Sequence, residues 1–363
     1  MKELFDDLLL FINHDNQTNK INRSINWDNI YAIAKEQGIL AIVWDGVQNL
    51  CKRGIISQNN MPPKSLKIQW ALSVEKITNR YLKQQNIIEK LSAFYSDHNI
   101  RMMLLKGYGL SLLYDCPEYR ECGDIDIWLY GDQKRADKII EYEKNIKVDV
   151  DRHHHTTFII NGTMVENHFN FLNIYAHRSN RYIEKELLRL SENENSIKIK
   201  VGNSDVFLPS PNLNALFLLR HSAVHFAAVS IKLRHILDWA KFIIRYHNEI
   251  DWKWLFKISE QYNMHQFLYG INSIVIKYFG VSQDMIPHFP CNSKLEDRIL
   301  NDILSQDECI SELQNRYLLS RVLFRFRRWW RNRWKHRIVY NEGLIQTFFT
   351  QVYSHLLKPK SLK

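Results

Sequence analysis

This sequence lacks several features of secreted and membrane-spanning proteins. Its five cysteines are scattered along 363 residues and no two form a C-x-x-C pair, so the sequence predicts neither a cysteine-based zinc site nor a disulfide framework. No apolar run approaches the roughly 20 residues that a helix needs to cross a bilayer. The segment Met1–Asp7 carries acids where a signal peptide carries basic residues. We therefore expect a reduced, cytoplasmic protein.

Positive charge is concentrated in one segment of the chain. Residues 316–337 hold nine Lys and Arg and no Asp or Glu, whereas the rest of the chain holds 40 basic and 39 acidic residues. On a helix, an apolar stripe through Leu319 and Trp330 would lie apart from a basic face that includes Arg321 and Lys335. This pattern predicts a basic amphipathic helix. Three partners fit it: the rest of the domain, an anionic membrane surface to which the protein would be peripheral, and nucleic acid.

Hydrophobic patterning divides the chain into three regions and shows no internal repeat. Residues 1–98 read as helical and end in a periodic stretch, 66–98, that contains neither Gly nor Pro. Residues 99–209 change to short apolar runs separated by turns, which is typical of strands. Residues 210–363 return to helical periodicity. The sequence therefore predicts an α+β fold with a helical region on each side of a mixed core.

The central region predicts several strands and one tight hairpin. Ile125–Tyr130 reads as a strand, and 132–143 suits a helix. Asn161-Gly162 is a strong signal for a two-residue hairpin, because both residue types adopt positive φ readily. Further strands are expected at Ile146–Val150, Thr156–Ile160, Met164–Phe169, Ile197–Val201 and Val206–Leu208.

The candidate chemistry centres on Gly123-Asp124-Ile125-Asp126-Ile127. Side chains alternate along a strand, so Asp124 and Asp126 point to one face and the isoleucines point to the other. Two carboxylates about 7 Å apart on one face can share divalent cations. Mg²⁺ prefers a few hard oxygen ligands together with substrate phosphates, and this pair offers such ligands.

Two flanking segments strengthen the metal interpretation. Lys106-Gly107-Tyr108-Gly109 follows an apolar run and precedes a short helical pattern, so this turn can present backbone N–H groups to phosphate. Glu166 lies on the strand that follows the predicted hairpin. A third carboxylate from a neighbouring strand would complete the metal site.

These motifs together resemble the uncharacterised nucleotidyltransferase family of the DNA polymerase β-like superfamily. The resemblance covers Trp27 to Asp238 and includes the L-K-G turn, an Arg before G-D-I-D, and V-E-x-H. It extends to a helical H-x-x-x-H, His221 to His225, and to an L-R-x-x-x-D pattern that ends at Asp238. The family implies a small mixed β-sheet nucleotidyltransferase core, here 99–209, flanked by helices.

The resemblance also implies an activity: transfer of a nucleoside monophosphate from an NTP to a hydroxyl acceptor, with two Mg²⁺ or Mn²⁺ ions. By this resemblance Asp124 and Asp126 bind both metals, and Glu166 is the third acid. The nucleotide-binding residues would be Lys106, Gly107, Gly109 and Arg120. The sequence departs from many superfamily members at the turn, which has Gly-Tyr-Gly in place of Gly-Gly or Gly-Ser. A small-molecule or protein acceptor is slightly preferred, because no RNA-binding motif is present.

Two other classes of function are compatible with the sequence. The chain would be a catalytically inactive nucleotide-binding relative if Glu166 lay far from Asp124 and Asp126. It would be a binding module if its activity lay in the basic segment 316–337.

The histidines give weaker signals. His153–His155 suggests zinc, but consecutive strand residues alternate faces and do not converge easily, so we expect surface or hairpin positions. His168 is either a buried, hydrogen-bonded residue or a catalytic one. His221 and His225 share a helical face, and without an H-E-x-x-H acid we expect core or substrate-pocket packing.

Arg234 and Asp238 are four residues apart on a predicted helix. Residues at this spacing are neighbours on a helix surface, so an ion pair between them is expected. The alternative is that Arg234 faces the nucleotide across a cleft.

Overall fold

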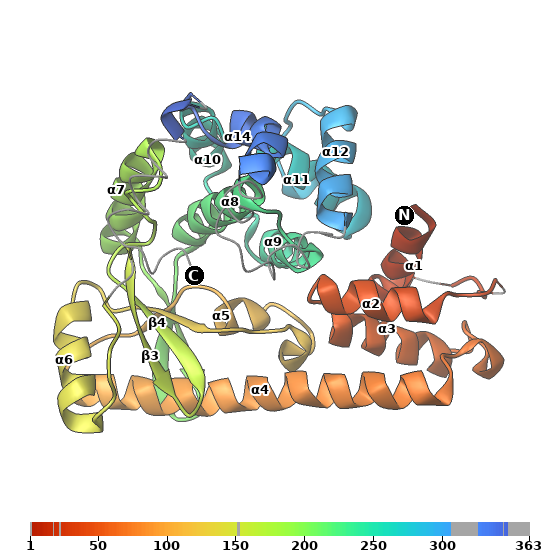
Figure 1. Cartoon of the computed structure of the whole chain (residues 1–363), viewed down its shortest axis with the longest axis horizontal. Helices are drawn as coiled ribbons and strands as arrows, with labels where there is room; N and C mark the ends of the chain where they lie inside the picture. The colour runs from red at the N-terminus through yellow and green to blue at the C-terminus, as the bar shows by residue number, and fades with distance from the viewer. Residues whose placement is uncertain are drawn as a thin grey trace.

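The longest helix, α4 (Lys64–Asp97), runs along one side of the molecule (Figure 1). Helices α2 and α3 lie at one end of it, and the β-sheet and α6 lie at the other. The helix is continuous because its sequence contains neither Gly nor Pro. The computed structural model describes residues 2–16, 18–21, 23–150, 153–305, 326–343 and 345–347.

Helices precede and follow the sheet along the chain. Those before or within it are α1 (Lys2–Ile12), α2 (Trp27–Glu36), α3 (Leu40–Lys52), α5 (Tyr108–Ser111), α6 (Gln133–Lys144) and α7 (Arg178–Asn193). Those after it are α8 (Pro211–Ala228), α9 (Leu233–Tyr246), α10 (Trp252–Gln261), α11 (His265–Tyr278), α12 (Ser293–Leu304) and α14 (Arg333–Val339). Short 3₁₀ helices lie at His14–Asn16, Gln58–Asn60, Pro117–Tyr119 and Gln283–Met285.

Six strands form one mixed sheet in the order β3-β4-β2-β1-β6-β5. The pairs β2–β4 and β1–β6 are parallel, and the other neighbours are antiparallel. This mixed sheet with flanking helices confirms the predicted α+β fold class. The strands are β1 (Met103–Leu104), β2 (Ile125–Trp128), β3 (His155–Ile160), β4 (Thr163–His168), β5 (Ile197–Val201) and β6 (Ser204–Leu208).

The predicted hairpin joins β3 to β4. Asn161 has φ of +49° and Gly162 has φ of +71°, as a turn with two left-handed residues requires. The strand predicted at Ile146–Val150 is wrong. Asn145 ends α6 in a left-handed conformation, and Asp149 makes only an isolated bridge with Thr157 on the outer edge of β3. One bridge does not make a ladder, so this segment is a loop.

The sheet separates its apolar residues from its polar ones. Ile125 and Ile127 are buried in a core cluster that also contains Leu91 of α4 and Ile140 of α6. Because side chains alternate along β2, Asp126 points to the opposite face of the sheet. Helices α8 and α9 lie on that side, so the candidate site forms between the sheet and these helices.

The predicted basic helix, 316–337, is only partly covered by the structure. Residues 316–325 lie outside the described residues, whereas 326–331 and α14 are helical. α14 packs against α8, and Trp334 meets the Phe226 ring edge-on at a centroid distance of 5.5 Å. This end of the segment therefore packs on the rest of the protein.

Lys335 does not lie on a solvated basic face, so that part of the prediction is wrong. Its side chain is 1% exposed, and Nζ lies 2.6 Å from Asp302 Oδ2 and 2.8 Å from the Val229 carbonyl oxygen. A buried ammonium is stable only with such partners. Trp330 on the preceding helical turn is half exposed.

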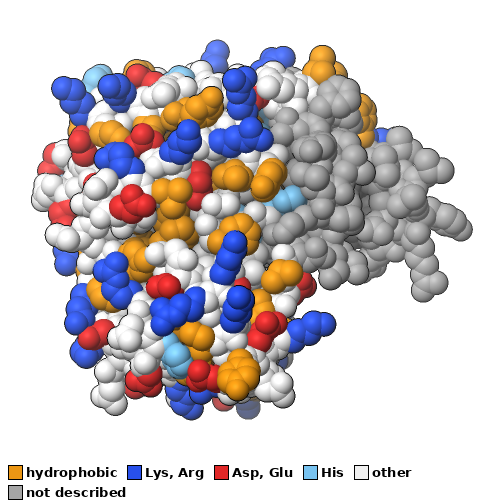
Figure 2. Space-filling model, turned by 90° about the vertical axis from the view of Figure 1, so that its left-hand side faces the viewer, with side chains coloured by type: hydrophobic (Ala, Val, Ile, Leu, Met, Phe, Trp, Pro, Cys, Tyr) orange, Lys and Arg blue, Asp and Glu red, His pale blue; other side chains and the backbone are white. Residues whose placement is uncertain are grey.

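Charge is mixed on the face that Figure 2 shows, which is the side of the molecule with α6 and α7. Lys and Arg side chains are interspersed there with Asp and Glu, and hydrophobic side chains lie between them. This agrees with a positive charge that is local in sequence. Within the part of the chain that the structure describes, no helix is both long and apolar enough to cross a bilayer.

Candidate active site

The parallel pairing of β2 and β4 brings two of the predicted acids together. Asp126 is the register partner of Glu166, and Trp128 is the partner of His168. Paired residues on neighbouring strands point to the same face of a sheet. Ligand atoms of Asp126, Glu166 and His168 all lie within 4.8 Å of one another. Asp124 precedes β2 by one residue, two positions before Asp126.

Asp126 is the most enclosed of the three acids, at 3% exposure. Its Oδ1 lies 2.7 Å from Lys106 Nζ and 3.1 Å from His168 Nε2. Burial alone would raise the pKa of Asp126, but the charge and hydrogen bonds of Lys106 and His168 outweigh burial and hold it well below its usual range. Asp126 is therefore ionised at neutral pH.

The neighbours of Asp126 respond to its charge. Burial, followed by the negative charge of Asp126, raises the pKa of Asp124 to about 6. Burial would lower the pKa of His168, but hydrogen bonds to Asp126 and Glu166 raise it to about 8. Burial would also lower the pKa of Lys106, but the Asp126, Asp124 and Glu166 carboxylates raise it. Lys106 and His168 thus serve as the counter-charges of the acids.

The turn after β1 is the second part of the site. Gly107 has φ of +53°, and a Cβ at this position would lie 3.3 Å from the Asp124 carbonyl oxygen. Only glycine adopts this backbone readily, so the turn can approach the acidic loop closely. Gly109 faces β6 rather than the acidic loop. Its N–H donates to the Lys106 carbonyl oxygen, and a Cβ on it would lie 3.0 Å from the Leu208 side chain. Gly109 therefore allows α5 to pack closely on β6.

A cavity of about 180 Å³ separates this turn and β2 from α8 and α9. Its volume is several times that of one water molecule. Both acidic and cationic side chains line it; the lining includes Asp124, Asp126, Lys106, Arg80, Arg234 and His221. This cavity agrees with the predicted pocket position of His221. The rings of His221 and His225 lie 4.4 Å apart between centroids.

Arg120 is committed to another acid. Its Nε and Nη2 lie 3.1 and 2.7 Å from the two carboxylate oxygens of Asp238, and the Tyr114 hydroxyl donates to the same carboxylate at 2.8 Å. The predicted ion pair between Arg234 and Asp238 is therefore wrong, because Asp238 is turned inward to Arg120. Arg234 instead donates to the Glu121 carbonyl at 3.1 Å and lines the cavity.

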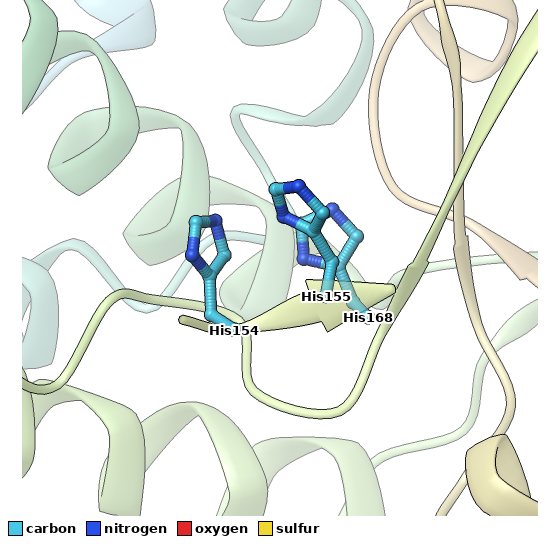
Figure 3. A group of neighbouring side chains, drawn as sticks. All are labelled: His154, His155 and His168. Carbon is cyan, nitrogen blue, oxygen red and sulfur yellow. The ribbon is translucent and has the colours of Figure 1, made fainter. Parts of the chain in front are cut away.

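Histidines next to the acids are the residues that sequence reasoning missed. His153 and His155 are buried and His154 is half-buried, so a surface position is wrong for them, whereas the hairpin alternative holds for His155, which begins β3. His154 and His155 lie beside His168, with ligand atoms of the three residues within 4.8 Å of one another (Figure 3). Burial lowers the pKa of His154 well below its usual value and that of His155 to about 4, so both rings are neutral at pH 7.

Part of this could have been found in the sequence. The Asn161-Gly162 hairpin fixes the register of β3 and β4, and that register pairs His155 at the start of β3 with His168 at the end of β4. The inward position of Asp238 has a sequence signal only in the L-R-x-x-x-D pattern of α9.

A mixed sheet that carries acids at the meeting of two parallel strands, with helices on both sides, is a fold of the nucleotidyltransferase type. Residues 23–280 match the family described as uncharacterised nucleotidyltransferase, and the chain belongs to this family. Among solved structures it is similar to an antigenic nucleotidyltransferase-like protein from Paracoccidioides brasiliensis, with 12% sequence identity and a TM-score of 0.36. That similarity covers 58% of this chain and 95% of the other. No curated protein matches the chain.

Proposed function

We propose that this protein transfers a nucleoside monophosphate from an NTP to a hydroxyl acceptor. The proposal depends on one observation: Asp126 and Glu166 are paired across two strands, beside a cavity that Asp124 and Lys106 also line. A small molecule or a protein is the preferred acceptor.

Mg²⁺ or Mn²⁺ is the proposed cofactor, held by Asp124, Asp126 and Glu166. The donor set fits, because carboxylate oxygens are the hard ligands these ions prefer. The raised pKa of Asp124, about 6, is caused by burial and by the charge of Asp126. A bound divalent cation would relieve that repulsion. When bound, two such ions would neutralise charge on the attacking oxygen and on the pyrophosphate leaving group.

Residues of the chain would bind and orient the substrates. Lys106 lies against Asp126 and lines the cavity, so its ammonium is within reach of a triphosphate bound there. The positive φ of Gly107 allows backbone N–H groups to come close to phosphate oxygens. His168 lies beside two carboxylates, and Glu166 is the less buried of them. We assign to Glu166 the role of general base that accepts the proton of the attacking hydroxyl.

The test is label transfer from each NTP, labelled on its α-phosphate, to components of a cell extract. Once the labelled acceptor is known, Asp126→Asn should lower the rate of label transfer by more than about 100-fold. Loss of a residue that only hydrogen-bonds to a metal ligand typically costs roughly 10–100-fold, and loss of the ligand itself should cost more. Asp205→Asn is the matched control, because Asp205 on β6 is exposed and pairs with Lys198 and Lys200. Full activity of Asp126→Asn would contradict the assignment. Nucleotide binding without any transfer would favour the inactive-relative alternative.

A further inference from the structure

We propose that His154, His155 and His168 bind one divalent transition-metal ion, such as Zn²⁺ or Co²⁺, next to the acidic residues (Figure 3). This goes beyond the proposed function, because the ligands are imidazole nitrogens and no nucleotide is needed for binding.

The three rings come from the bend before β3, from the start of β3 and from the end of β4. Their centroids lie 4.4 Å apart for His154 and His155, 5.4 Å for His154 and His168, and 5.1 Å for His155 and His168. Nitrogens around a tetrahedral zinc ion lie roughly 3.4 Å apart, as zinc–nitrogen bonds of about 2.0–2.1 Å require. Side-chain rotations that move each nitrogen by about 1 Å would close this gap from the present spacing of up to 4.8 Å.

Two ring nitrogens in the cluster are buried without a partner. Nδ1 of His154 and Nδ1 of His155 have no hydrogen-bond partner within the described part of the chain. Burial of a polar atom without a partner costs free energy, so such atoms require an explanation. A metal ion accounts for these two nitrogens in a way that further protein packing does not. His168 has partners on both nitrogens, with Nδ1 3.2 Å from the Asn170 carbonyl oxygen and Nε2 3.1 Å from Asp126 Oδ1, so it would become the third ligand by releasing its Nε2 proton to solvent.

The backbone explains why adjacent histidines share this place. His154 lies in a bend just before β3, and its carbonyl oxygen accepts from two N–H groups, of Phe169 at 3.0 Å and of Asn170 at 3.1 Å. The regular ladder starts only at His155, opposite His168. An irregularity of this bulge-like kind re-aims a side chain and breaks the strand alternation. His154 is thereby free to lie beside His155.

The donor set selects the class of ion. Imidazole suits zinc, cobalt and related ions, whereas Mg²⁺ prefers oxygen ligands. Glu166 lies 3.6 Å from His155 Nε2 and from His168 Nε2, so a carboxylate stands next to two of the ligands. Three protein ligands leave one position of a tetrahedral ion open, as in catalytic rather than structural zinc sites.

The experiment is a titration of the metal-free full chain with Co²⁺ in excess Mg²⁺, followed by the visible d–d absorption of the bound ion. We expect one absorbing Co²⁺ per chain. The signal should be lost in His155→Ala and retained in Asp124→Asn and in His288→Asn. His288 is an exposed histidine outside the cluster and serves as the matched control.

A second readout guards against a variant that does not fold. Zn²⁺ should raise the melting temperature of the wild-type chain and of His288→Asn, but not that of His154→Gln. Glutamine is similar in size to histidine, so this substitution at a half-buried position should leave the fold intact. Absence of bound Co²⁺ in the wild type would overturn the proposal. It would also be overturned by a signal that persists in His155→Ala and disappears in Asp124→Asn, because the ion would then sit at the carboxylates.

Discussion

Arg120 and Asp238 lie 118 residues apart and are joined by two hydrogen bonds, from Nε and Nη2 to the two carboxylate oxygens. Both side chains are almost completely buried. Because Arg120 precedes Gly123 by only three residues, this ion pair ties the loop that carries the first acid to α9. Arg120 also lines the cavity, so the ion pair fixes one part of its wall next to the acids.

Removal of one partner should therefore destabilise the protein strongly. Asp238→Ala leaves the Arg120 guanidinium buried without its counter-charge, and we expect a loss of about 3–5 kcal/mol in the free energy of unfolding. Urea denaturation measures this. Lys241→Ala removes a partner of Asp115, whose side chain is 91% exposed, and should have a much smaller effect. Equal losses in both variants would show that the buried pair has no special role.

A pH effect on stability is expected from Glu184 of α7. Its carboxylate accepts backbone N–H groups of Phe171 and Leu172, both at 2.9 Å, yet burial outweighs these bonds and raises its pKa from 4.5 to about 7. The folded state then binds more protons than the unfolded state between pH 4.5 and 7. The contribution of this group is fully present below pH 4.5 and is lost as the pH rises through 7.

The change at Glu184 amounts to about 3 kcal/mol over that range. Glu184→Gln stays neutral, so its unfolding free energy relative to wild type should rise between pH 4.5 and 7.5. Glu186→Gln, which removes a more exposed carboxylate from the same helix, is the control. A parallel pH dependence of Glu184→Gln and wild type would refute the prediction.

Gly107 should tolerate substitution poorly. With φ of +53°, Gly107→Ala places a side chain in a region that only glycine enters readily, at a cost of about 1–3 kcal/mol. Gly123→Ala is a stringent comparison, because its Cβ would have no atom within 4 Å and its φ lies outside the left-handed region. Thermal unfolding of both variants tests this, and a Gly107→Ala protein as stable as Gly123→Ala would rule out the strain.

Nucleotide binding should depend on divalent metal. An NTP is expected to raise the melting temperature in the presence of Mg²⁺, since a ligand bound to the folded state stabilises it. In EDTA the triphosphate would face three carboxylates without neutralisation, and the shift should vanish. The same shift in EDTA would mean that metal does not bridge phosphates to Asp124, Asp126 and Glu166.

The partners proposed for the basic segment also need a test that keeps α14 in place, since Trp334 and Lys335 pack on the rest of the protein. Arg321→Gln/Arg325→Gln removes two positive charges and leaves α14 unchanged. If the segment binds an anionic surface, this variant should sediment less with phosphatidylserine vesicles, or with single-stranded oligonucleotides, at low salt. If the variant sediments like the wild type with vesicles and with oligonucleotides, the role of the basic segment is packing on the rest of the protein.

Local signals in the sequence determined the elements that carry the site. The absence of Gly and Pro gave α4 its length, and Asn161-Gly162 fixed the hairpin and therefore the strand with Glu166. Alternation along β2 placed Asp126 on the face opposite Ile125 and Ile127, and Asp124, which precedes the strand, lines the same cavity as Asp126. These are short-range effects of backbone sterics and side-chain periodicity, so one sequence was enough to predict them.

Only the tertiary structure decided which distant charges meet. Asp238 pairs with Arg120 rather than with Arg234, and Lys335 is buried against Asp302, although helical spacing predicted otherwise in both cases. The bend before β3 likewise brought His154 beside His168 against the alternation of strands. Burial makes an unpaired charge or polar atom costly, so long-range packing selects the partner, and spacing along the chain contains no record of that choice.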